Sequence, residues 1–154
     1  MLAGDVEAVE RARPLLQPMC REVHSIGAIP SAMSMKLAIN LYLIATVASL
    51  AEAANLAQAL NLDLELFHGL IRTGPLCSDV AMAKLDKIVR RDFAPQAAIQ
   101  DVCKNAALVA EAAAVAGAHA PLLGDSRRLF EEALQNGSGG LDMAAVFEAF
   151  SKRR

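Results

Sequence analysis

The chain has 154 residues, of which 55% are apolar and 21% are charged, and this composition excludes a disordered protein. Fifteen basic and seventeen acidic residues give a net charge of −2, which excludes the strongly basic surface of a nucleic-acid-binding protein. Only 4% of the residues are aromatic while alanine is abundant, so the composition favours helices over strands. The length indicates one domain, or a compact part of a larger enzyme.

The N-terminal third predicts two helices separated by an extended segment. Asp5 can cap a first helix over residues 6–17. Residues 22–26 alternate and include β-branched side chains, which predicts a short extended segment before Gly27. Neither Gly nor Pro interrupts residues 31–60, which predicts one very long helix. This helix is apolar nearly all round, so we expect other helices or a second subunit to cover it.

The rest of the chain also predicts helices joined by short loops. Asp63 and Ser78 are suited to cap two of them, and Pro95 and Pro121 to begin two more. The predicted ranges are 63–72, 78–90, 95–117, 121–135 and a last helix from Asp142 onward. The expected fold is therefore all-α, a helical bundle around the long central helix. We expect residues 1–154 to form a single domain without an internal boundary.

Several classes of protein are not predicted. The longest uncharged apolar run, residues 37–51, is shorter than the roughly 20 residues that cross a bilayer, so we expect no membrane span. The three cysteines form no CxxC pair, and no histidine is followed by a further ligand three or four residues later, so we expect no metal site. Unpaired cysteines are typical of a reducing compartment, which predicts a cytoplasmic protein.

Lys36 and Asn40 are the first candidates for chemistry. They are four residues apart, so both side chains project from one face of the long helix. Methionines and a leucine flank Lys36, and a lysine in apolar surroundings has a lowered pKa that suits it to acid–base catalysis. The alternative is a lysine that extends to solvent near a helix end, beside an asparagine bonded to backbone.

Asp101 is the second candidate. Its carboxylate could pair with the distant Lys36 and hold it in place. The alternative is a local pair with Lys104 or Asn105, which follow three and four residues later on the same helix. Spacing alone leaves both interpretations open. No GxGxxG turn follows a strand anywhere in the chain, so no dinucleotide-binding cradle is predicted within it.

The order of these segments resembles the C-terminal helical domain of the β-hydroxyacid dehydrogenase family, the 3-hydroxyisobutyrate dehydrogenase-like enzymes of the 6-phosphogluconate dehydrogenase superfamily. Lys36-Leu-Ala-Ile-Asn40 resembles the family's catalytic K-x-x-x-N helix. Gly27 precedes it as in the family, and Phe93 stands eight residues before Asp101 like the family's Phe and the Asp of its Lys-Asp pair. Gly137-Ser-Gly139 followed by Asp142 resembles the family's G-x-G-x-x-D ending.

The resemblance implies an NAD- or NADP-dependent oxidoreductase that acts on a short hydroxy acid or aldehyde. It implies Lys36 as the general acid/base, Asn40 and Gly27 at the substrate, Asp101 as the residue that positions the lysine, and Phe93 and position 100 on the cofactor side. It also implies a homodimer through the long helices. The N-terminal Rossmann domain that binds most of the cofactor in such enzymes is absent from this chain, so we expect the isolated chain to be inactive.

Two departures leave alternatives open. Pro30 and Ala32 replace two of the family's glycines before the lysine, and Gln100 replaces the lysine of the Lys-Asp pair. These changes would also fit a non-catalytic dimerisation module derived from the family. An imine-reductase-like relative would share the helical architecture, but Lys36 argues against it because such enzymes often replace this lysine.

Overall fold

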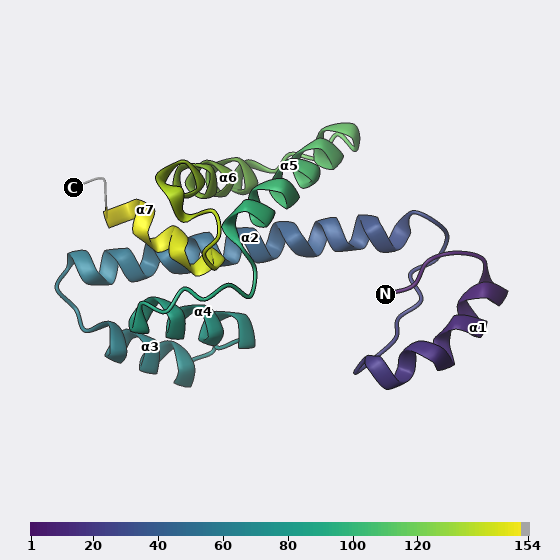
Figure 1. The fold of residues 1–154 in the computed structure, drawn as a ribbon, viewed down its shortest axis with the longest axis horizontal. Coiled ribbons are helices and arrows are strands. Elements are labelled where there is room, and N and C mark those ends of the chain that lie inside the picture. The colour runs from purple at the N-terminus through teal and green to yellow at the C-terminus, as the bar shows by residue number, and fades with distance from the viewer. Residues whose placement is uncertain (152–154) are drawn as a thin grey trace. The chain divides into compact units, whose positions relative to one another are not determined.

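The computed structural model describes residues 1–151, and helices joined by short loops make up most of them (Figure 1). No strand forms within that range, where β-pairing is confined to two isolated bridges, so the predicted all-α class is confirmed. The predicted caps Asp5, Asp63 and Ser78 each accept a hydrogen bond from backbone N–H groups of their helices. The helices are α1 (Val6–Leu16), α2 (Ser31–Ala59), α3 (Leu64–Thr73), α4 (Asp79–Arg90), α5 (Ile99–Val115), α6 (Pro121–Ala133) and α7 (Phe147–Ser151).

The chain divides into two compact units, Met1–Asn40 and the part from Leu41 onward, and α2 runs from one into the other. In the first unit, α1 connects two extended segments that pair in parallel. The N–H of Leu2 donates to the carbonyl of His24 at 2.8 Å, and the N–H of Ile26 donates to the carbonyl of Leu2 at 2.8 Å. The extended segment predicted at residues 22–26 thus has Leu2 as its partner, which the sequence did not indicate.

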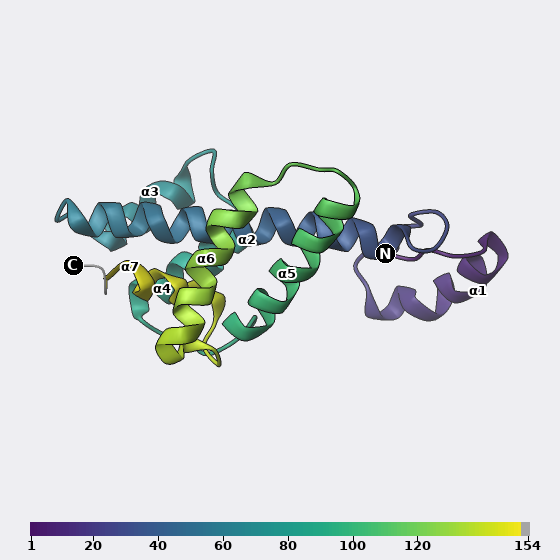
Figure 2. The same cartoon turned by 90° about the horizontal axis from the view of Figure 1, so that it is seen from above.

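The second unit is built around the C-terminal two thirds of α2. In Figure 1, α3 and α4 lie on one side of this helix and α5 and α6 on the other. Figure 2 shows α5 and α6 side by side, and these two helices pack against each other. Small side chains dominate the buried stripe of α2, which lets the neighbouring helices approach closely. The stripe consists of Ile44, Val47, Ala48, Ala51, Ala54 and Ala57.

Only one stripe of α2 is fully buried within the single chain. The helix is long and apolar enough to cross a membrane by length and composition alone, a test that core helices of soluble proteins also pass. Only 28% of its most apolar window is buried. Other helices of the chain thus cover one stripe of α2, and the side that includes Tyr42, Leu56 and Leu60 is exposed. Cover of that side by a second subunit stays a prediction.

The predicted start of α5 is wrong. Pro95 was expected in the first turn, but the helix begins at Ile99. Two carbonyls of the preceding segment instead accept hydrogen bonds from the residues around Asp142. The N–H of Asp142 donates to the carbonyl of Phe93 at 2.9 Å, and the N–H of Met143 donates to the carbonyl of Ala97 at 2.8 Å. These pairings keep the residues before Ile99 out of the helix, and Ala98 forms an isolated antiparallel bridge with Asp142. The segment after Asp142 starts as one tight 3-10 turn and becomes α-helical at Phe147.

Candidate functional site

Lys36 and Asn40 lie one turn apart on α2, as predicted, and both belong to the first unit. Lys36 is exposed, and so are the neighbouring Met33 and Met35. The single chain thus does not supply the apolar enclosure predicted for this amine. Gly27, three residues before the cis peptide bond at Pro30, has φ +108°, a value that L side chains rarely adopt, and its carbonyl accepts the N–H of Gly4 at 2.9 Å.

The other predicted site residues lie in the second unit, at the start of α5. The Asp101 carboxylate is 57% exposed and pairs with the Lys104 ammonium at 3.2 Å, while the Asn105 amide donates to the Asp101 carbonyl at 2.8 Å. Within the chain, Asp101 therefore forms the local contacts with Lys104 and Asn105 that were one of its two expected interpretations. Gln100 is exposed, and its N–H donates to the carbonyl of Gly139 at 3.0 Å. Phe93 is half-buried. A pairing of Asp101 with Lys36 stays a prediction.

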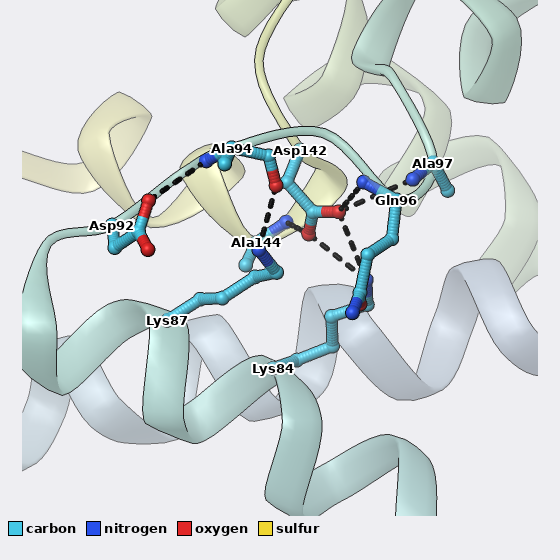
Figure 3. A network of polar contacts seen from close by, with 8 residues as sticks. All are labelled: Lys84, Lys87, Asp92, Ala94, Gln96, Ala97, Asp142 and Ala144. Carbon is cyan, nitrogen blue, oxygen red and sulfur yellow. Dashed lines mark hydrogen bonds and ion pairs between the residues drawn. The ribbon is translucent and has the colours of Figure 1, made fainter.

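A buried ion pair beside this segment was not predicted. The ammonium of Lys84, on α4, lies 2.9 and 3.0 Å from the two carboxylate oxygens of Asp142, and these residues are only 6% and 0% exposed. The Lys84 ammonium also donates to the Gln96 side-chain oxygen at 3.3 Å. Figure 3 shows the two charged groups enclosed between α4, the loop after Phe93 and the segment after Asp142. Sequence reasoning identified Asp142 only as a helix start and motif residue.

Backbone donors complete the coordination of the Asp142 carboxylate. One oxygen accepts the N–H groups of Gln96 at 2.9 Å and Ala97 at 3.2 Å, and the other accepts the N–H of Ala144 at 3.0 Å. Burial alone would raise the pKa of this carboxyl. The hydrogen bonds from Ala144, Gln96, Lys84 and Ala97 outweigh that effect and lower the pKa below its ordinary value. Asp142 is therefore held as a carboxylate.

One sequence signal could have located Lys84. It stands three residues after Ala81 and four before Ile88, both of which are buried on α4, so it shares the apolar face of that helix. A lysine at such a position needs either a route to solvent or a buried partner. Its partner stands 58 residues away in the sequence, so local spacing could not reveal it.

The second unit also carries an open apolar groove of about 770 Å³ between α2, α3 and the residues that lead into α4. None of its lining residues is charged. Its largest side chains are Tyr42, Leu50, Phe67, Ile71, Leu76 and Leu122. Tyr42 is 72% exposed, which is unusual for a large aromatic side chain in an apolar setting. The groove has the composition of a surface that another apolar element covers.

Across residues 1–151, no group of three His, Cys, Asp or Glu side chains could hold a metal ion.

The chain is similar to several known dehydrogenases. The family model for the NAD-binding region of NADP-dependent 3-hydroxyisobutyrate dehydrogenase matches residues 31–150. L-Threonate dehydrogenase of Escherichia coli (strain K12) is 28% identical over 152 residues, which are 98% of this chain and 50% of that protein. The crystal structure of 3-hydroxyisobutyrate dehydrogenase from Salmonella typhimurium has a TM-score of 0.89 at 25% identity, over 95% of this chain and 52% of that one.

A second solved structure gives the same result. 3-Hydroxyisobutyrate dehydrogenase from Mycobacterium tuberculosis, determined with L-serine, has a TM-score of 0.86 at 25% identity, over 100% of this chain and 54% of that one. The chain thus spans about half the length of the relatives it matches. The family match covers most of the chain, from the start of α2 to α7. The chain therefore belongs to the 3-hydroxyisobutyrate dehydrogenase family of β-hydroxyacid dehydrogenases, which use NAD or NADP.

Proposed function

We propose that the chain is the C-terminal catalytic and dimer-forming part of an NAD(P)-dependent β-hydroxyacid dehydrogenase or reductase. The family match over residues 31–150 carries this proposal, because it includes Lys36, Asn40 and the start of α5. The substrate class is a short hydroxy acid or the corresponding aldehyde. The names of the relatives, an L-threonate and a 3-hydroxyisobutyrate dehydrogenase, support that class, and we expect the enzyme to act in the cytoplasm.

In the proposed reaction, Lys36 moves a proton at the substrate oxygen. The ammonium donates to a carbonyl oxygen during reduction, and the neutral amine removes the hydroxyl proton during oxidation. Asn40, one turn further on the same face, is proposed to donate a hydrogen bond to the substrate, and the Gly27 backbone is proposed to border the substrate site. The nicotinamide, when bound, gives or accepts the hydride. Asp101 is proposed to position Lys36.

The cofactor needs more than this chain. Phe93 and Gln100 can supply an apolar side and an amide to a nicotinamide cofactor, and their backbone is fixed by hydrogen bonds to the segment of residues 139–142. The sequence contains no glycine-rich phosphate cradle. We therefore expect the isolated chain to have little or no turnover.

Lys36 is exposed on the single chain, so the proposal requires other parts of the enzyme to enclose it. A nucleotide-binding domain and a second subunit would supply the apolar surroundings that the single chain lacks. We propose that the second subunit is another copy of the chain and that it covers the exposed side of α2. The uncharged groove that includes Tyr42 and Phe67 supports this role, because charged residues are depleted at the centre of such interfaces.

The decisive experiment compares Lys36→Ala with the unmodified chain, each joined to a nucleotide-binding half of the family, on a panel of short β-hydroxy acids with NAD⁺ and NADP⁺. We expect Lys36→Ala to reduce kcat by roughly 10²–10⁴-fold, the usual contribution of a positioned acid–base group. Arg90→Ala serves as the control, since Arg90 forms an exposed ion pair with Asp86 on α4. Equal rates for Lys36→Ala and the unmodified protein would remove Lys36 from the mechanism. No activity in either would favour the non-catalytic dimerisation module.

A further inference from the structure

The buried pair of Lys84 and Asp142 joins three segments that are far apart in the sequence. Lys84 belongs to α4, its second acceptor Gln96 belongs to the loop before α5, and Asp142 precedes the last turn-and-helix segment. Figure 3 shows the Lys84 side chain approaching Asp142 from α4, while Gln96, in the loop, meets Asp142 through its backbone and directs its side chain toward Lys84. The contacts therefore set the place of the loop relative to both α4 and the C-terminal segment.

Backbone hydrogen bonds extend this connection into α5. The N–H of Ile99 donates to the carbonyl of Leu141 at 2.9 Å, and the N–H of Gln100 donates to that of Gly139 at 3.0 Å. Together with the bonds from Asp142 and Met143 to the carbonyls of Phe93 and Ala97, they pair residues 93–100 with residues 139–143 along their length. Asp142 stands in the middle of this pairing.

The lysine is not needed to satisfy the Asp142 carboxylate. Three backbone N–H groups already donate to its two oxygens. A buried ion pair also adds little net stability compared with an apolar pair of similar size, because both charges must leave water. The cation does impose one geometry, since it must lie within hydrogen-bond distance of both carboxylate oxygens and of Gln96 at once. The pair thus selects one arrangement of the loop.

We propose that Lys84 and Asp142 are positioning residues that hold residues 93–100 in a single conformation and thereby present Phe93 and Gln100 on the cofactor side of the site. This inference rests on the proposed function only for the role of Phe93 and Gln100. The positioning itself concerns contacts within the second unit and is testable without any activity. Lys84 acts through Asp142 and does not touch substrate.

The test measures amide hydrogen exchange in the 154-residue chain and in Lys84→Met, which keeps the apolar stem and removes the cation. We expect the amides of Ala97, Ile99 and Gln100 to exchange at least tenfold faster in Lys84→Met, with amides in the middle of α6 changing less than twofold. Arg90→Gln is the matched control, because it removes an exposed ion pair with Asp86 on the same helix and leaves exchange unchanged. Unchanged exchange at residues 97–100, or an equal increase in all helices, overturns the proposal.

A second measurement separates the charge of Lys84 from its packing. A pocket of about 300 Å³, lined by Leu43, Val80, Ala83 and Gln96, lies next to the lysine and is open to solvent. Lys84→Ala enlarges that pocket, so propylammonium can enter and place a cation near Asp142. We expect millimolar propylammonium to slow exchange at residues 97–100 in Lys84→Ala at least fivefold, and neutral propanol to have no such effect. Equal effects of the two compounds overturn the role of the charge.

The joined enzyme supplies a functional measurement. Loosening residues 93–100 weakens cofactor binding more than it slows the chemical step. We therefore expect Lys84→Met to raise the KM for NAD⁺ or NADP⁺ at least fivefold and to change kcat less than twofold. A fall in kcat with an unchanged cofactor KM contradicts the proposal. If the joined protein has no activity, the proposed function fails, and the exchange measurements on the chain alone still decide whether Lys84 positions the loop.

Discussion

Removal of the Asp142 carboxylate is the perturbation whose cost the structure defines best. Asp142→Ala leaves the Lys84 ammonium buried without its anion and removes the acceptor of three backbone N–H groups. Loss of one partner of a buried ion pair costs roughly 3–5 kcal/mol. We expect about 4 kcal/mol here, a large part of the roughly 5–15 kcal/mol by which a domain is stable. At about 2–4 °C per kcal/mol for a chain of this size, Tm falls by roughly 8–16 °C.

The assay is thermal and urea unfolding of the 154-residue chain, followed by circular dichroism at one fixed protein concentration, because self-association would add to the apparent stability. Asp101→Ala is the control, since its ion pair with Lys104 is 57% and 72% exposed and exposed pairs contribute at most about 1 kcal/mol. Asp142→Asn, which keeps the shape, provides a milder variant where Asp142→Ala fails to fold. Equal losses for Asp142→Asn and Asp101→Ala would refute the reasoning from burial.

Three further predictions concern pH, backbone strain and association. Because the folded state lowers the pKa of Asp142 below its ordinary 3.8, the carboxylate stabilises the fold above that pH, and the stability advantage over Asp142→Asn shrinks as the pH falls below it in urea unfolding. Gly27→Ala costs about 1–3 kcal/mol in urea unfolding because φ is +108°, whereas Gly69→Ala, inside α3 with open space, stabilises by up to about 1 kcal/mol. We expect Tyr42→Glu to convert the proposed dimer to monomer in analytical ultracentrifugation, whereas Val115→Glu, which is outside the groove, does not.

Local signals predicted the helices well because their causes lie within a few residues. The caps Asp5, Asp63 and Ser78 act on N–H groups two or three residues ahead, so the sequence contains both partners side by side. The long α2 was predicted within one residue, since no Gly or Pro interrupts it. The order and spacing of Lys36, Asn40 and the later motifs also identified the family, which the match over residues 31–150 confirms.

The errors arose where a distant segment decides the local structure. Proline suits the first turn of a helix, and Pro95 therefore predicted a start that the Asp142 segment prevents by binding the backbone of Phe93 and Ala97. The pairing of Leu2 with Ser25 was not predicted for a similar reason, because a single bridge between residues on either side of α1 leaves no periodic pattern in the sequence. Lys84 looked like an ordinary charged residue of α4, since its partner is 58 residues away. Long-range pairing is the information that these local patterns lack.

The start of α5 shows how the structure changes the interpretation of a departure from the family pattern. Gln100 replaces the lysine that would precede Asp101, and this suggested that the site has lost a cation. On α5, however, the Lys104 ammonium lies 3.2 Å from the Asp101 carboxylate, one turn along the helix. Residues three apart on a helix occupy the same face, so the Lys104 ammonium places a positive charge next to the Asp101 carboxylate. Asp101 therefore has a charged partner within the chain, although Gln100 stands in the position directly before it.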